Sequence, residues 1–66
     1  HPREDRPLFS VQTPARGMTM EQVVKNFGLP EQEHPPVGQP PITRWVYPQF
    51  TVYFEQQYVI QAVLAR

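Results

Sequence analysis

The sequence contains no cysteine, no excess of one charge and no long apolar run, and each absence excludes a class of protein. Without cysteine, neither a disulfide nor a thiolate metal site can brace the fold. The 6 basic and 6 acidic residues cancel, so the clustered positive charge that binds nucleic acid is missing and we expect no nucleic-acid partner. No stretch has the length of a transmembrane helix. The 66 residues therefore predict one small domain of modest stability.

The N-terminal residues differ in character from the rest of the chain. Residues 1–8 carry charges and prolines with little to bury, so we expect a flexible tail before a single domain that spans residues 9–66. Phe9 and Val11 alternate with polar residues, which predicts a short edge strand or extended segment that Pro14 ends. Because the chain starts at His1 rather than at Met, we expect a processed or trimmed product whose missing N-terminus carried targeting information.

Residues 17–30 predict one short helix with both ends marked. Thr19 is a good N-cap, and Gln22 stands three residues later, where it can complete a capping box. Gly28 can take the left-handed conformation that closes a helix, and Pro30 prevents its continuation. Two helical turns are not stable alone in water, so this helix must pack on the C-terminal third of the chain. Its apolar residues follow the spacing of a single stripe: Met20, Val23, Val24 and Phe27.

The remaining sequence predicts a small antiparallel sheet. Residues 29–42 contain five prolines, and we expect a long loop there, because proline fits neither a helix interior nor a central strand. From Thr43 onward, apolar residues recur with a period of two, as in half-buried strands. Turns at 48–49 and 56–57 divide this part into three strands, the last at 58–64 with two possible registers. The predicted fold is α+β: one short helix packed on a three-stranded antiparallel β-meander in two layers.

A three-stranded sheet with one helix has a face that the helix does not cover. We expect Trp45 to lie in the core with the phenylalanines at positions 27, 50 and 54, because a small sheet fills its core with aromatic residues. The opposite face is then a candidate partner-binding surface, although ordinary exposed residues would show the same pattern. Alternation places on that face Arg44, Val46, Thr51 and Tyr53, with Ile60 as a further candidate.

Candidate catalytic and metal-binding residues are few, and most of them fall in the predicted proline-rich loop. Ser10, His34 and either Glu31 or Glu33 can be drawn as a triad, but nothing in a proline-rich loop holds the histidine beside its partners. The same two glutamates and His34 offer a metal only one imidazole, whereas structural zinc takes four nitrogen or sulfur ligands. We therefore predict a protein that is not an enzyme, with no catalytic residue, no metal and no cofactor.

Several short motifs resemble the SmpA/OmlA (BamE) lipoprotein domain over residues 16–64. The resemblance implies a BamE-like fold, a periplasmic location, often at the inner face of the outer membrane, and a non-enzymatic scaffold or binding role. The same unit resembles each half of the β-lactamase inhibitory protein, in which the concave face of the sheet grips an enzyme. The motifs are Gly17-Met18-Thr19, Gln22-Val23, Gly28-x-Pro30, Trp45-x-Tyr47, a strand ending in Phe54 and a strand starting at Val59.

The resemblance leads to one expected function and two alternatives. We expect a small binding or scaffold module of the bacterial envelope, whose partner is an envelope protein or a second copy of the chain. The first alternative is a proteinaceous inhibitor of an envelope hydrolase that uses the uncovered sheet face and the 29–42 loop. The second is a sensor domain for a small ligand or peptidoglycan. The family's lipoproteins are acylated on a cysteine, so contact with the membrane is expected only through a lipid anchor absent from this chain.

Overall fold

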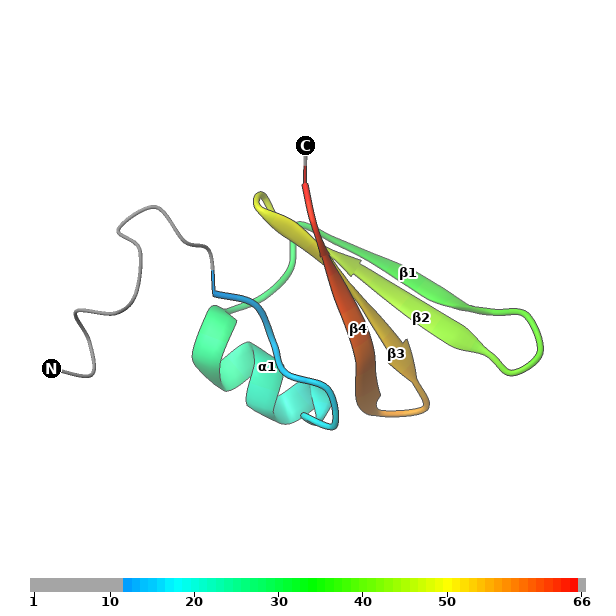
Figure 1. The fold of residues 1–66 in the computed structure, drawn as a ribbon. Helices are drawn as coiled ribbons and strands as arrows, with labels where there is room; N and C mark the ends of the chain where they lie inside the picture. Colours follow the sequence, from blue (N-terminus) through cyan, green and yellow to red (C-terminus); the bar gives the residue numbers. More distant parts are fainter. Residues whose placement is uncertain (1–11, 66) are drawn as a thin grey trace, which may run out of the picture.

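The computed structural model describes residues 12–65, which form one helix beside one antiparallel sheet (Figure 1). The helix α1 lies against one face of the sheet, so the fold is α+β in two layers. The strands are hydrogen-bonded in the order β1-β2-β3-β4, and each is antiparallel to the next. The elements are α1 (Met20–Phe27), β1 (Gln32–Val37), β2 (Ile42–Val46), β3 (Phe50–Glu55) and β4 (Tyr58–Leu64).

Predictions for the N-terminal residues are largely untested by this structure. The flexible tail expected at residues 1–8 lies outside the described residues. So do Phe9 and Val11, which carried the expected edge strand. Gln12 and Thr13 are described and belong to neither a helix nor a strand.

Both predicted ends of α1 are confirmed. The Thr19 hydroxyl accepts a hydrogen bond from the Gln22 amide at 3.2 Å, and the Gln22 side chain accepts one from the Thr19 amide at 3.0 Å, which completes the capping box. Gly28 ends the helix, and its amide donates to the Val24 carbonyl at 2.8 Å. Its φ of 86° is positive as expected, but its ψ of −175° is extended rather than left-handed helical. Glycine alone adopts this conformation readily.

Backbone hydrogen bonds tie the start of α1 to β4. The Gly17 amide donates to the Val59 carbonyl at 2.9 Å, and the Val59 amide donates to the Met18 carbonyl at 2.8 Å. The Met20 amide donates to the Gln57 carbonyl at 3.0 Å, so the first turn of the helix is anchored at the β3–β4 turn. The short helix is thus held to the sheet by main-chain bonds as well as by its apolar stripe.

The predicted count of three strands is wrong, because the sheet has a fourth strand within the expected proline-rich loop. β1 contains Pro35 and Pro36. It is an edge strand, so one of its sides has no neighbouring strand, and a proline that faces this side removes no hydrogen bond of the sheet. Its pairing with β2 becomes irregular between His34 and Val37, where the two prolines lie. Residues 29–42 therefore form an edge strand and most of a β-hairpin rather than a loop.

The core is aromatic, as predicted, and lies between α1 and the sheet. The Trp45 side chain is 7% exposed, and its ring lies 4.6 Å from that of Phe54 between centroids. Phe27 contacts Phe50 edge-on at 5.6 Å, which joins the end of α1 to β3. Met20, Val24 and Phe27 of the helix stripe are partly buried against this cluster. The buried hydrophobic residues of the core are Val23, Trp45, Tyr47, Phe50, Val52, Phe54 and Val59.

A β-bulge settles the register of β4. Tyr53 pairs with Gln61 and Phe54 pairs with Val59, so Ile60 is the extra residue between two consecutive pairs. The bulge shifts the alternation by one residue, and neither of the two predicted registers holds along the whole strand. Val59 is therefore buried on the α1 side, whereas Val63 is 48% exposed.

Candidate functional site

The sheet surface opposite α1, called the open face from here on, brings together the four residues predicted to bind a partner. Arg44 of β2 pairs with Tyr53 of β3, and Val46 pairs with Thr51. Directly opposed residues on neighbouring strands point to the same face, with Cβ atoms about 4.5–5.5 Å apart. The predicted set thus forms one contiguous block on a surface that the helix does not cover.

The outer strands widen this block into two rows. His34 of β1 pairs with Arg44, and Gln61 of β4 pairs with Tyr53, which extends the first row to both sides. In the second row Val46 pairs with Gln32, and Thr51 pairs with Val63. His34 and Gln32 were not predicted to lie on the open face, because residues 29–42 were expected to form a loop.

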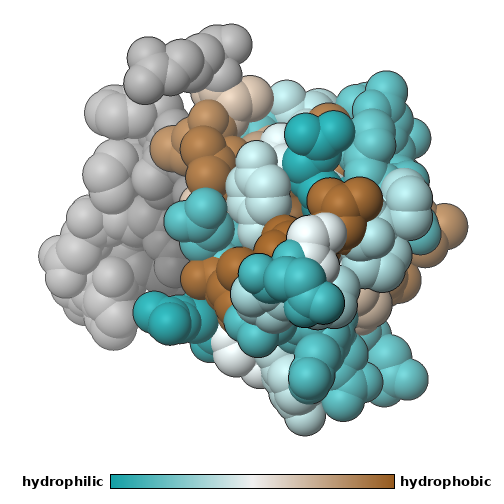
Figure 2. All heavy atoms as spheres, turned by 90° about the vertical axis from the view of Figure 1, so that its right-hand side faces the viewer, coloured by the Kyte–Doolittle hydropathy of each residue, from teal (hydrophilic) through white to brown (hydrophobic). Residues whose placement is uncertain are grey.

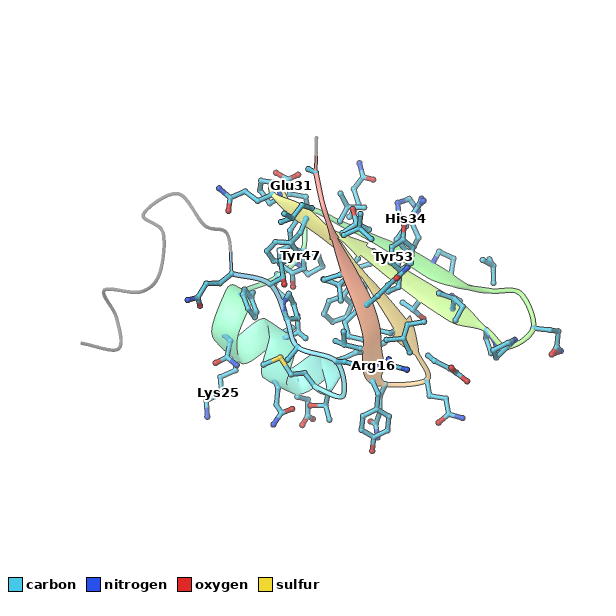
Figure 3. The ribbon with its side chains drawn as sticks, viewed as in Figure 1. Arg16, Lys25, Glu31, His34, Tyr47 and Tyr53 are labelled. Atoms are coloured by element: carbon cyan, nitrogen blue, oxygen red, sulfur yellow. The ribbon has the colours of Figure 1, made fainter. Side chains whose placement is uncertain are left out.

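A pocket of about 330 Å³ opens on this face beside the β1–β2 hairpin. Arg44, Tyr53 and His34 line it together with apolar side chains of the hairpin. Figure 3 places His34 and Tyr53 on the side of the sheet away from α1, whereas Tyr47 lies on the α1 side. The volume of the pocket is at the lower end of the range for small-ligand pockets. The apolar lining residues are Pro35, Val37 and Ile42.

Arg44 is the permanent cation of this pocket and is not neutralised within the described chain. Its side chain is exposed, and it makes no ion pair or hydrogen bond with any residue from 12 to 65. His34 is half-buried, and its Nε2 lies 3.2 Å from the Gln32 side-chain oxygen, which can only accept.

The residues considered for a triad or a metal site do not converge. Glu33 pairs with Trp45 on the α1 side, so it points to the opposite face from its neighbour His34. Glu31 precedes β1, and Ser10 lies outside the described residues. Between residues 12 and 65, no group of three histidine, cysteine or acidic side chains lies close enough to hold a metal ion.

Tyr47 is a core aromatic residue whose hydroxyl contact was not predicted from the sequence. Its ring is 6% exposed, and its hydroxyl donates to the Gly28 carbonyl at 2.8 Å. Burial, and to a lesser extent the charge of Glu33, raise the pKa of this phenol above its ordinary value. The hydroxyl thus joins β2 to the end of α1, so its role is structural. The Gly28-x-Pro30 motif and Tyr47 are both evident in the sequence, but the hydrogen bond between Tyr47 and Gly28 cannot be predicted from it.

Hydrophobic side chains also reach the surface at the end of the molecule where the β1–β2 hairpin turns. Figure 2 shows them there as separate patches among hydrophilic residues. Val37, at the end of β1, is 68% exposed. The hairpin therefore offers apolar contact area next to the open-face pocket.

Comparison of the chain with protein-family models, with curated proteins and with solved structures found no match. Within residues 12–65, no helix is long and apolar enough to cross a membrane. The likeness to the SmpA/OmlA domain therefore stays a prediction that rests on the sequence motifs. The geometry of the open face does not depend on that likeness.

Proposed function

We propose that the protein is a small, non-catalytic binding or scaffold module of the bacterial envelope, periplasmic or associated with the outer membrane. The family motifs support the location and the BamE-like character of the fold. One observation supports the binding role: the predicted partner-binding residues form one block on the face that α1 leaves uncovered. Arginine and tyrosine are enriched among the residues that carry binding energy at protein interfaces, and this block pairs one of each, Arg44 and Tyr53.

Tyr53 is the proposed anchor of the partner. It is half-buried at the centre of the sheet, where Arg44 and Gln61 flank it on the neighbouring strands. A tyrosine offers a large contact area at a low cost in side-chain entropy, and its hydroxyl can bond at the rim. Its ring packs on the face opposite the core, so its loss should leave the core intact.

The β1–β2 hairpin favours an inhibitor of an envelope hydrolase as a second candidate function. Figure 1 shows that the turn of this hairpin extends away from α1, past the β3–β4 turn. Val37 presents exposed apolar surface there, next to the open-face pocket. A protruding hairpin with an apolar end suits insertion into the cleft of an enzyme, with the open face making the surrounding contacts.

The binding role is tested by comparing three proteins: wild type, Tyr53→Ala and Lys25→Ala. Lys25 is the matched control, because its exposed side chain points from α1 away from the sheet (Figure 3). Each protein is used to capture partners from a periplasmic extract, and the affinity of the purified partner is then measured by calorimetry. We expect Tyr53→Ala to weaken binding by more than about 1 kcal/mol and Lys25→Ala to leave it unchanged.

Equal affinities for wild type and Tyr53→Ala would contradict the proposal. If the purified partner is a hydrolase, its activity in the presence of the protein separates the two candidate functions. Dose-dependent inhibition that Tyr53→Ala relieves supports the inhibitor. Unchanged hydrolysis in a tight complex supports the scaffold.

A further inference from the structure

The open-face pocket has two walls of different chemistry. One wall contains Arg44, which supplies nitrogen donors, together with His34, its pairing partner on β1. Val37 and Ile42, which also pair across these strands, form an apolar wall. Arg44 and Ile42 are two residues apart on one strand, so the two walls are about 7 Å apart along β2.

The donor wall is complementary to an anion. A guanidinium carries five N–H donors, and none of those on Arg44 is used within residues 12–65. Glu55 is the acidic residue of β3 on this face, and it pairs with Ile42 rather than with Arg44 and makes no ion pair within residues 12–65. A carboxylate fits the planar guanidinium with two parallel hydrogen bonds, and His34 and Tyr53 line the same pocket.

The sheet edge beside the pocket restricts how a peptide can bind. β1 is an edge strand, and Pro35 and Pro36 have no N–H to donate to an added strand. A partner therefore cannot extend the sheet by continuous main-chain pairing next to the pocket. Recognition there depends on the side chains that line the pocket.

Building on the proposed function, we propose that this pocket binds the C-terminal residue of a partner polypeptide. The free carboxylate lies on Arg44, and the apolar side chain lies against Val37 and Ile42. The pocket volume of about 330 Å³ is at the small end of the range for ligand sites, which suits the end of a chain better than a longer segment. A C-terminal apolar residue carries both required groups at once, whereas an internal acidic residue needs a second residue for the apolar wall and a chain that leaves the pocket again.

The test is a titration of the isotopically labelled protein followed by NMR. The probe is a pentapeptide of glycine and serine that ends in leucine with a free carboxylate. Its control is the same peptide with an amidated C-terminus. We expect the peptide with the free carboxylate to shift the backbone amide signals of His34, Arg44 and Tyr53 in a saturable manner. The amidated control peptide should bind at least about tenfold more weakly.

Two variants assign the contact. Arg44→Gln should weaken binding of the free acid about tenfold, and Arg44→Lys should give a smaller loss, because it keeps the charge but not the planar fork. Arg16→Gln is the matched control, since Arg16 is exposed in the turn before α1 and does not line the pocket. Arg44 is itself exposed, so all variants should fold, as circular dichroism can show.

Three results would overturn the inference: equal binding of the acid and amide peptides, no effect of Arg44→Gln, or no saturable shift at millimolar peptide. Tighter binding of an amidated peptide with an internal glutamate would also overturn it, because the carboxylate would then not be terminal. These failures differ from failure of the proposed function. Loss of a protein partner in Tyr53→Ala would still support the open face when the terminal peptide does not bind.

Discussion

At the residue scale, Tyr47 shows how one side chain joins the two layers. Its ring packs against Phe50 with centroids 4.9 Å apart, and its hydroxyl donates to the Gly28 carbonyl at the end of α1. A buried hydroxyl without a partner would be destabilising, so this hydrogen bond permits tyrosine at a core position. The bond also satisfies a carbonyl where the helix has ended.

We expect Tyr47→Phe to lower the free energy of unfolding by about 0.5–1.5 kcal/mol, because the ring still packs while the Gly28 carbonyl loses its donor. Urea denaturation at neutral pH measures the change. Tyr58→Phe is the matched control, since Tyr58 is 45% exposed and its stability effect should be near zero. A loss no larger than that of the control would show that the hydrogen bond does not stabilise the fold.

The same phenol predicts a loss of stability in alkali. The pKa of Tyr47 is raised above 10.0 by burial and by Glu33, whereas in the unfolded chain it is close to that value. Above about pH 10 the unfolded state therefore releases a proton that the folded state retains, so the free energy of unfolding falls as pH rises. Below the unfolded pKa, this contribution is fully present.

Unfolding midpoints of wild type and Tyr47→Phe at about pH 9 and about pH 11 measure this effect. We expect wild type to lose more stability over the interval than Tyr47→Phe, which has no phenol at this position. Equal losses would mean that the other tyrosines account for the pH dependence.

At the element scale, the helix illustrates what local sequence signals can predict. Each signal connects residues that are at most four positions apart: the capping pair, the glycine at the helix end, and successive members of the apolar stripe. Such signals can be recognised without knowledge of the fold. The alternation of apolar and polar residues likewise predicts β2 and β3 from local sequence. β1 was not predicted in this way, because five of its six residues are exposed and an edge strand needs no alternation.

The bulge in β4 lies beyond local reasoning for a different reason. Whether Ile60 is paired depends on the residues of β3 opposite it, not on its own neighbours in the chain. In the sequence at 58–64, either set of alternating residues is apolar enough to face the core. The pairing of Phe54 with Val59 decides that Val59 faces the core.

We expect Thr19→Ala to destabilise the protein by about 0.5–2 kcal/mol, because the Gln22 amide loses the hydroxyl that caps it. Thermal unfolding followed by circular dichroism measures the change. Lys25→Ala, on the exposed side of the same helix, controls for helix propensity and should have a much smaller effect. If both variants melt together, the capping box does not contribute as described.

At the scale of the whole molecule, one face of the sheet is the core and the other is the candidate binding surface. Trp45 belongs to the first, and truncating it should cost about 3–5 kcal/mol, a large part of the stability of a domain this small. Since Trp45 is the sole tryptophan, its fluorescence reports on the core directly. We expect blue-shifted tryptophan emission from the folded protein. Trp45→Phe should remain folded, whereas Trp45→Ala should be partly or wholly unfolded. Emission typical of tryptophan in water would contradict this packing.

The composition of the open face was predictable only in part. Alternation along β2 and β3 identified Arg44, Val46, Thr51 and Tyr53, because strands in the centre of a sheet follow a strict period of two. His34 and the hairpin residues of the pocket were not identified as part of this face, since their positions depend on the unpredicted edge strand. The sequence therefore predicts the central residues of the proposed partner-binding surface, but not the pocket beside them.

Photocrosslinking from two positions tests most directly whether the open face is the binding surface. A photoreactive derivative of phenylalanine, which keeps the aromatic ring of the proposed anchor, replaces either Tyr53 on the open face or Lys25 on the outer side of α1, and each protein is irradiated in periplasmic extract. We predict a discrete crosslinked partner from position 53, absent from position 25, and competed away by excess wild-type protein but not by Tyr53→Ala. The same crosslinks from both positions, or none that wild-type protein displaces, would contradict the account.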